Sequence, residues 1–218
     1  MAEISDIAEE TKTIYDISPE ISERSAVFPG DCQFKRSVAL DFKKGDNLVL
    51  SSITTTVHIG AHTDAPSHYH RDGAGIEARD LSYYLGPCQV ISVSLPRSER
   101  ILPENIAKVV IRAKRVLFKT RSFPDPDNWN SDFNSLSAGL VEVLASRGVC
   151  LVGIDTPSID PSADQMLESH NTVFKHGMAI LEGIVLDRVP DGIYHLVALP
   201  LKIKGADASP VRAVLWKS

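Results

Sequence analysis

Cysteine is scarce in this chain, which has three among its 218 residues. Cys32, Cys88 and Cys150 lie far apart, their number is odd, and no two of them form a CxxC pair. Disulfide frameworks and cysteine-based zinc sites both need paired or closely spaced cysteines. The sequence therefore predicts free thiols in a reducing compartment.

Long apolar runs are missing as well, and none approaches the roughly 20 residues that a membrane-spanning helix requires. The first residues, MAEISDIAEETKT, are acidic and lack the basic flank and apolar core of a signal peptide. Together with the unpaired cysteines, these features predict a cytoplasmic protein that has no membrane partner.

Positive charge is not in excess: Lys and Arg total 23 against 28 Asp and Glu, a formal net charge of −5. A mildly acidic chain without a basic stripe is not expected to bind nucleic acid. The phosphate-binding patterns GxGxxG and GxxxxGK[ST] are also absent, so the sequence does not support a nucleotide cofactor. A small-molecule substrate fits this composition better.

The sequence does contain many short segments rich in Val, Ile and Leu, which are typical of strands. The strands we expect are Arg36–Phe42, Leu48–His58, Cys88–Ser94, Arg115–Thr120, Cys150–Ile154, Tyr194–Leu199 and Arg212–Trp216. Helices are predicted at Pro103–Ala113, at Ser137–Arg147 after a capping serine, and from Ser162 towards Phe174. Strands outnumber helices and do not alternate strictly with them, which favours a single α/β domain with a mixed sheet.

Four of the seven histidines fall within VHIGAHTDAPSHYH, residues 57–70. The β-branched residues before it, Gly60 and Pro66 oppose a helix, so this is not an HExxH zinc helix. In a straight strand the α-carbons of His58 and His62 would lie about 13 Å apart, although a zinc–nitrogen bond spans only about 2 Å. If both bind one ion, the chain must bend between them, and Gly60 is where we expect the bend.

Histidine and aspartate without thiolate suit Zn²⁺, Mn²⁺ or Fe²⁺ in a catalytic site, and an aspartate such as Asp64 can bridge two ions. Such a set needs further ligands, and the best donors are His170 and Glu182. Glu182 lies in an otherwise apolar run, where a carboxylate needs a partner to compensate for its burial. The residues themselves leave two interpretations open, a metal site and a polar surface loop.

The segment HIGAHTDAPSH resembles the HxGxHxDxPxH signature of the cyclase-like metal-dependent hydrolases, a family that includes the bacterial kynurenine formamidases. The resemblance extends over Thr13 to Lys217, so we expect a hydrolase domain at residues 13–218 and an N-terminal extension at residues 1–12. The further segments that point to the formamidase branch are DISPEISERSAVFPGD, LVGIDTPSIDP, HGMAILEGIVLDRVPDGIYHLVALPL and ADASPVRAVL.

The resemblance implies a swivelling β/β/α fold, assembly as a homodimer or larger homo-oligomer, and hydrolysis of N-formyl-L-kynurenine. It also implies the role of each site residue. His58, His62 and Asp64 would bind one divalent metal, Asp64 would reach a second ion bound by His170, and Glu182 would be shared. The ions would be two zinc ions, with manganese also suitable. His68 would be the general acid and base.

One departure concerns Phe28, at a position where relatives often carry tryptophan. A phenylalanine still offers a ring to an aromatic substrate but has no indole N–H, so it bears on substrate preference rather than on chemistry. Two alternatives therefore stay open: a related hydrolase of cyclic amides or lactones, such as an isatin-type hydrolase, and a metal-binding module without catalysis. Away from the site, Asp155 is expected in a turn, and Asp207 is expected to pair with Arg212.

Overall fold

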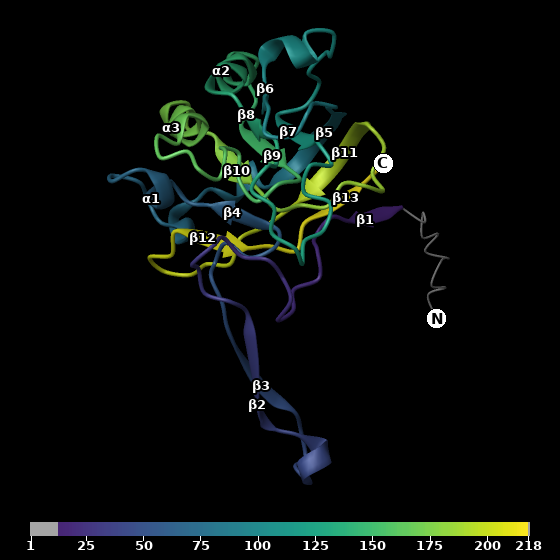
Figure 1. Ribbon diagram of the computed structural model, residues 1–218, viewed down its shortest axis with the longest axis vertical. Coiled ribbons are helices and arrows are strands. Elements are labelled where there is room, and N and C mark those ends of the chain that lie inside the picture. The colour runs from purple at the N-terminus through teal and green to yellow at the C-terminus, as the bar shows by residue number, and fades with distance from the viewer. Residues whose placement is uncertain (1–12, 218) are drawn as a thin grey trace, which may run out of the picture.

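A seven-stranded mixed sheet runs through the protein, whose computed structural model describes residues 13–217 (Figure 1). The strand order is β1-β13-β11-β5-β7-β9-β10. Strands β5, β7, β9 and β10 are parallel, whereas β11, β13 and β1 extend the sheet through antiparallel pairings. Its strands are β1 (Ile14–Asp16), β5 (Leu85–Ser92), β7 (Arg115–Lys119), β9 (Leu151–Ile154), β10 (Ala179–Leu181), β11 (Gly192–Val197) and β13 (Val214–Trp216).

The remaining elements are short. Three two-stranded pairs are formed by β2 (Lys35–Leu40) with β3 (Leu50–Thr54), β4 (His62–Asp64) with β12 (Ala208–Pro210), and β6 (Arg100–Ile101) with β8 (Ser135–Leu136). The α-helices are α1 (Pro66–Tyr69), α2 (Ala138–Ser146) and α3 (Glu168–Lys175). The 3-10 turns are η1 (Phe42–Lys44), η2 (Ile76–Ala78), η3 (Leu81–Tyr83) and η4 (Pro103–Ile106).

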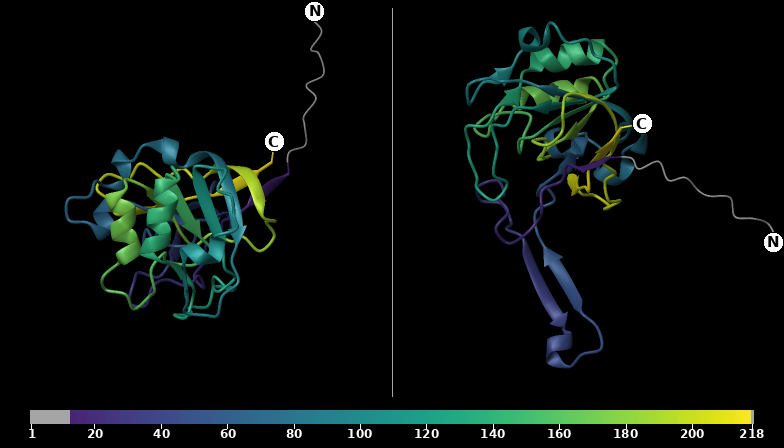
Figure 2. Two further views of the ribbon diagram at one scale, coloured as in Figure 1. Left: turned by 90° about the horizontal axis from the view of Figure 1, so that it is seen from above. Right: turned by 90° about the vertical axis from the view of Figure 1, so that its right-hand side faces the viewer.

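The two faces of the sheet carry separate apolar clusters. Side chains alternate along β9, so Val152 and Ile154 pack on one face with Leu140 and Val173 from the two longer helices. On the opposite face, Leu151 joins a cluster from the β1, β5 and β11 side of the sheet. Helices α2 and α3 thus cover one face, while β4 and β12 lie on the other side (Figures 1 and 2). Because β9 is buried on both faces, its sequence is a continuous apolar run.

The predicted α/β fold with a mixed sheet in a single domain is confirmed. All seven expected strands are present with shifted or shorter bounds, and the helix after Ser137 is confirmed, since the Ser137 side chain accepts a hydrogen bond from the Leu140 N–H. The helix expected at Pro103–Ala113 is wrong: only the 3-10 turn Pro103–Ile106 forms. Three consecutive β-branched residues, Val109, Val110 and Ile111, follow this turn, and residues 109–114 alternate between half-buried and exposed, which is the period of an extended chain and not of a helix.

Strands β2 and β3 form a hairpin that extends far from the rest of the protein (Figures 1 and 2). We call residues 35–54 the arm and the remainder of the described chain the body. The arm leaves the body between Asp31 and His58, and the Thr56 N–H donates to the Cys32 carbonyl at 3.2 Å at its base. The predicted extension at residues 1–12 lies outside the described residues. Among residues 13–217, no helix combines the length and apolar character needed to cross a membrane.

Candidate metal centre

The histidine-rich segment bends at Gly60, whose φ of 58° lies in the left-handed region that glycine adopts without strain. The bend separates a turn carrying His58 from strand β4, which begins at His62, and it brings the two imidazole ring centres to 5.2 Å. The Gly60 carbonyl accepts a hydrogen bond from His62 Nδ1 at 2.9 Å. This bond places the proton on Nδ1, so His62 Nε2 is left with a free lone pair.

Strand β4 also brings in Glu182, which follows β10. The His62 N–H donates to the Glu182 carbonyl at 3.1 Å and the Glu182 N–H donates back at 2.9 Å, so the two residues are fixed side by side. Glu182 Oε2 lies 3.2 Å from His62 Nε2, and Oε1 accepts the Ile159 N–H at 2.7 Å. Glu182 forms no ion pair with Arg188 or Lys202; within the described chain its ion-pair partners are histidines.

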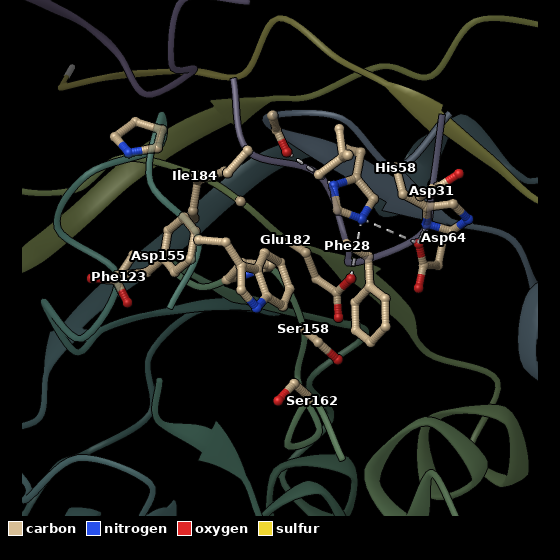
Figure 3. Close-up of a pocket in the computed structure, with 18 of the residues that line it drawn as sticks. Phe28, Asp31, His58, Asp64, Phe123, Asp155, Ser158, Ser162, Glu182 and Ile184 are labelled. Atoms are coloured by element: carbon tan, nitrogen blue, oxygen red, sulfur yellow. Dashed lines mark hydrogen bonds and ion pairs between the residues drawn. The ribbon is translucent and has the colours of Figure 1, made fainter. Parts of the chain in front are cut away.

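Helix α3 supplies His170, which reaches the same point. Its Nε2 lies 3.4 Å from Asp64 Oδ2 and 3.6 Å from Glu182 Oε1. His58 also approaches Asp64, with Nδ1 3.1 Å from Oδ1 (Figure 3). Asp64 is therefore the centre of the arrangement, and residues far apart in the sequence converge on its carboxylate.

Buried polar atoms in this cluster lack hydrogen-bond partners. They are His62 Nε2 and both carboxylate oxygens of Asp64. Buried polar groups are satisfied in nearly all native structures, so three such atoms facing one another need another partner. Nitrogen and carboxylate oxygen donors without thiolate are a ligand set for Zn²⁺ or Mn²⁺. The residues therefore fit a divalent cation.

The ligand atoms that lie closest together form two groups that share Asp64. One comprises His62, Asp64 and Glu182, and the other comprises His58, Asp64 and His68; in each, the candidate ligand atoms lie within 4.8 Å of one another. His68 comes from α1, and its ring centre lies 4.2 Å from that of His58. All six polar residues singled out from the sequence are thus brought together. The geometry also gives His68 a position from which it could bind metal.

Two aspartates that the sequence analysis did not assign to the site, Asp160 and Asp207, contact the outer nitrogens of the histidines. Asp160 accepts a hydrogen bond from His170 Nδ1 at 2.7 Å. Asp207 Oδ2 lies 3.0 Å from His58 Nε2 and 3.3 Å from His68 Nδ1. Such carboxylates fix the ring orientation of metal-binding histidines. Asp160 lies in the segment LVGIDTPSIDP and Asp207 in the segment ADASPVRAVL. The family resemblance of these two segments was the signal in the sequence that could have pointed to them.

The expected pairing of Asp207 with Arg212 is wrong. Arg212 instead donates to Asp16 at 2.9 Å, next to the antiparallel ladder of β1 and β13. Asp207 faces the histidines because the β12 ladder with β4 places Ala208 opposite Asp64. Asp155 lies in the bend that follows β9, as expected, and its carboxylate accepts the N–H groups of Thr120 and Arg121 beyond the end of β7, each at 2.9 Å.

The carboxylates in and around the cluster stabilise positive charge there. Burial opposes protonation of His58, but Asp64 and Asp207 outweigh it and raise the pKa of His58 to about 9. Burial has the same opposing effect on His170, and the nearby carboxylates raise its pKa to about 10. Burial tends to raise the pKa of Asp64, yet contacts with His170 and His58 hold it well below its usual range. A divalent ion would take the place of these protons.

A cavity of about 470 Å³ opens beside the cluster, and His68, Asp64 and Glu182 are among the residues that line it. Aromatic side chains also line it, and Phe28, which lies near Glu182 and Asp64 in Figure 3, is among them with 47% of its surface exposed. Trp129, which the sequence analysis did not select, meets Phe28 edge to face at 5.2 Å between ring centres. The signal for Trp129 was weak, because a lone tryptophan in a polar loop has no spacing to tie it to the site.

The protein thus combines a mixed-sheet fold with a buried cluster of histidines and carboxylates that borders an open cavity. This combination is typical of the active site of a metal-dependent hydrolase. The family model described as "Putative cyclase" matches residues 15–161. The chain is 44% identical over 209 residues to a protein of Polaromonas naphthalenivorans (strain CJ2) named kynurenine formamidase, covering 95% of this chain and 92% of that protein. The chain therefore belongs to the cyclase family.

Solved structures agree with this assignment. A protein described as a "potential metal-dependent hydrolase with cyclase activity" is 32% identical, with a TM-score of 0.82 and coverage of 95% of this chain and 98% of the other. Isatin hydrolase A from Labrenzia aggregata is 24% identical, with a TM-score of 0.79 and coverage of 94% and 93%. The second similarity shows a shared fold only.

Proposed function

We propose that this protein is a metal-dependent arylformamidase that hydrolyses N-formyl-L-kynurenine to L-kynurenine and formate in tryptophan degradation. The observation that carries the proposal is the set of buried, unpartnered ligand atoms on His62 and Asp64 at the end of an aromatic-lined cavity. The 44% identical relative named kynurenine formamidase supports the choice of substrate.

We assign the metal ligands as follows. His58, His62 and Asp64 hold one divalent ion, Asp64 also reaches a second ion held by His170, and Glu182 is shared between them. We propose zinc for both ions, with manganese as the alternative, because both metals accept imidazole and carboxylate. A bound divalent ion supplies Lewis acidity and makes water acidic enough to yield hydroxide near neutral pH.

The proton transfers are assigned to His68. Its side chain is 36% exposed, so it borders the cavity while Asp207 holds its Nδ1. From this position His68 can accept a proton from the attacking water and deliver it to the departing aryl amine. No serine nucleophile is needed for this reaction.

We place the aryl ring of the substrate against Phe28 and Trp129. Their edge-to-face pair presents apolar surface to the cavity, and Trp129 carries an indole N–H. Trp129 can thus supply the indole ring and N–H that Phe28 lacks. Trp129→Ala should raise KM for N-formyl-L-kynurenine roughly 3- to 10-fold, the equivalent of one aromatic contact. Hydrolysis of a non-aromatic formamide is the control and should not change.

The runner-up function is hydrolysis of a cyclic amide, as in isatin hydrolases, and Phe28 together with the shared fold keeps it open. A metal-binding module without catalysis is less well supported, because the cluster opens into a cavity instead of closing into a full structural shell. We further propose a cytoplasmic location and assembly as a homodimer or a larger homo-oligomer.

The test combines elemental analysis with turnover of N-formyl-L-kynurenine, simple formanilides and isatin by the purified protein. We expect a divalent metal to co-purify and formylkynurenine to be the best substrate. Faster turnover of isatin would favour the runner-up. Full formamidase activity in chelated, metal-free protein would refute the mechanism, and saturated metal without any hydrolysis would favour a binding module.

A further inference from the structure

The cavity beside the metal cluster is lined by acidic side chains that the cluster does not use. They are Asp31, Asp155 and Asp164, and among residues 13–217 no lysine or arginine lines the cavity. The histidines that line it belong to the metal cluster. Proteins usually bind a carboxylate through arginine or lysine, and the substrate proposed above carries both an α-ammonium and an α-carboxylate group. The cavity therefore offers counter-ions for the first group and none for the second.

The three carboxylates have different surroundings. Asp164 Oδ2 lies 2.5 Å from Arg100 Nη2, so its charge is compensated. Asp31 is exposed to solvent, which screens its charge. Asp155 is only 8% exposed and forms no ion pair within the described chain. Because a buried charge without a counter-ion is unfavourable, Asp155 is the carboxylate that would gain most from a cation in the cavity.

Neutral donors hold the Asp155 carboxylate. It accepts the Thr120 hydroxyl at 2.6 Å and the N–H groups of Thr120 and Arg121 at 2.9 Å. A carboxylate can accept about four hydrogen bonds, so these three donors leave room for one more. Burial raises the pKa of Asp155 above its usual value in spite of these bonds, which means that they do not fully compensate the buried charge.

The sheet fixes the position of Asp155. Thr120 directly follows β7 and Asp155 directly follows β9, and these neighbouring strands run parallel. Open α/β sheets bind their ligands at the carboxyl ends of such strands. In Figure 3, Asp155 and Phe123 lie on one side of the view, and Asp64 and His58 lie on the other. Asp155 is therefore separate from the metal cluster but lines the same cavity.

We propose that Asp155 binds the ammonium group of the substrate's side chain, and that the cavity accepts aryl formamides with a cationic side chain whether or not they carry an α-carboxylate. This inference rests on the proposed formamidase function. The side chain of N-formyl-L-kynurenine leaves the aryl ring next to the formamide, so the ammonium group at its end can extend from the cluster towards Asp155. The reaction is the same for the whole class: water adds to the formyl carbon, the carbon–nitrogen bond breaks, and formate and the aryl amine are released.

The first experiment compares four aryl formamides as substrates of the wild-type enzyme. They are N-formyl-L-kynurenine, its decarboxylated analogue with only the ammonium group, its deaminated analogue with only the carboxylate, and the analogue that lacks both groups. A hydrogen bond between ammonium and carboxylate should make kcat/KM of the decarboxylated analogue roughly 10- to 100-fold higher than that of the uncharged analogue, mainly through KM. The deaminated analogue should be the poorest substrate, because the carboxylates of the cavity repel it.

Asp155→Asn removes the charge of the proposed receptor and almost none of its volume. The ratio of kcat/KM for the decarboxylated analogue to that for the uncharged analogue should then fall to nearly one. Thr120→Val is the structural control, because it removes the hydrogen bond at 2.6 Å and leaves the carboxylate in place, so the ratio should persist. Asp31→Asn makes the same charge change at an exposed position of the same cavity and should alter the ratio much less.

A binding measurement gives the same comparison without hydrolysis. Calorimetry on the wild-type protein compares the aryl amines that the decarboxylated and deaminated analogues would release. The amine with the ammonium side chain should bind more tightly than the amine with the carboxylate side chain. Circular dichroism checks that each variant is folded, and the two wild-type comparisons decide the question if Asp155→Asn does not fold.

Two results would overturn the inference. One is that the deaminated analogue is hydrolysed, and its product bound, as well as the decarboxylated counterpart, which would mean that a cation from outside the described residues completes the cavity. The other is a folded Asp155→Asn variant that keeps the wild-type ratio. A failure of the proposed function has a different pattern, in which none of the four formamides is hydrolysed while the preferred binding of the ammonium product still supports Asp155 as the receptor.

Discussion

The metal centre buries charged side chains, whereas the arm exposes apolar ones, and both placements differ from what is usual in a folded protein. In the centre, the charged residues Asp64 and Glu182 are 1% and 2% exposed. In the arm, the apolar residues Ile53 and Phe42 are 63% and 66% exposed. Burying an unpaired carboxylate and exposing an apolar patch are both unfavourable in an isolated chain. Each region therefore has side chains without a suitable partner in the described chain: the residues of the first fit a metal ion, and the apolar residues of the second are uncovered.

The two regions are adjacent in the sequence. Strand β3 ends at Thr54 and His58 follows in the next turn, while Phe28 and Asp31 in the cavity wall lead into β2. The arm is thus an insertion within the segments that form one side of the cavity. The difference between the two regions can be tested by substitutions in each of them.

The largest effect is expected from Asp64→Ala. Both proposed ions share this carboxylate, so the variant should lose metal content and N-formyl-L-kynurenine hydrolysis together, as chelation of the wild type should. Metal is measured by elemental analysis and activity by the absorbance of the product. Asp16→Asn, in the exposed pair with Arg212, is the control and should change neither. An Asp64→Ala variant with full metal content would contradict the assignment.

His68→Ala separates proton transfer from metal binding. If His68 acts as general acid and base, the variant keeps its metal and kcat falls roughly 10²- to 10⁴-fold. The control is His70→Ala, because His70 stacks on Phe174 at 3.7 Å and lies outside the cluster. Loss of metal from His68→Ala would instead identify it as a ligand beside His58 and Asp64, as their mutual distances allow.

Asp160→Asn tests whether metal affinity depends on the carboxylate that orients the proposed ligand His170. Asp160 accepts the Nδ1–H of His170, and an amide would bind that ring less strongly. Metal affinity should fall roughly 10- to 100-fold, the usual cost of losing such a carboxylate. Titration against a competing chelator measures it. Unchanged affinity would mean that Asp160 serves only the fold, through its ion pair with Arg100 and its hydrogen bonds from the Ser169 and His170 N–H groups.

Much of the fold could be predicted from the sequence because strand signals are local. Runs such as Cys150–Ile154 and Arg115–Thr120 are buried on both faces, and a continuous apolar run predicts such a strand directly. The helix expected at Pro103–Ala113 failed because Ile106, Val109 and Ile111 pack on the apolar cluster beside α2 and α3 from a non-helical segment, in which Val110 is exposed. Strand β4 has only three residues and includes two polar ligands, so it gave no strand signal.

The candidate site was predicted in part for a similar reason. His58, His62, Asp64 and His68 lie in one segment, and Glu182 stands out as a charge within an apolar run. Asp160 and Asp207 gave no such local signal, because their partners are ten or more residues away in the sequence. Their roles depend on the β4 and β12 register and on the docking of α3, which only the three-dimensional fold determines.

The smallest effect is expected in the arm, where Ile53→Ala should change the free energy of unfolding of the single chain by no more than about 0.5 kcal/mol. The matched comparison is Ile154→Ala, which empties a fully buried position in β9 and should cost roughly 2–5 kcal/mol. Urea denaturation measures both, at protein concentrations low enough to keep the chains apart, because dimerisation would otherwise add to the apparent stability. If the two substitutions cost the same, Ile53 packs on its own body, and the contrast between a buried polar centre and an uncovered apolar arm does not hold.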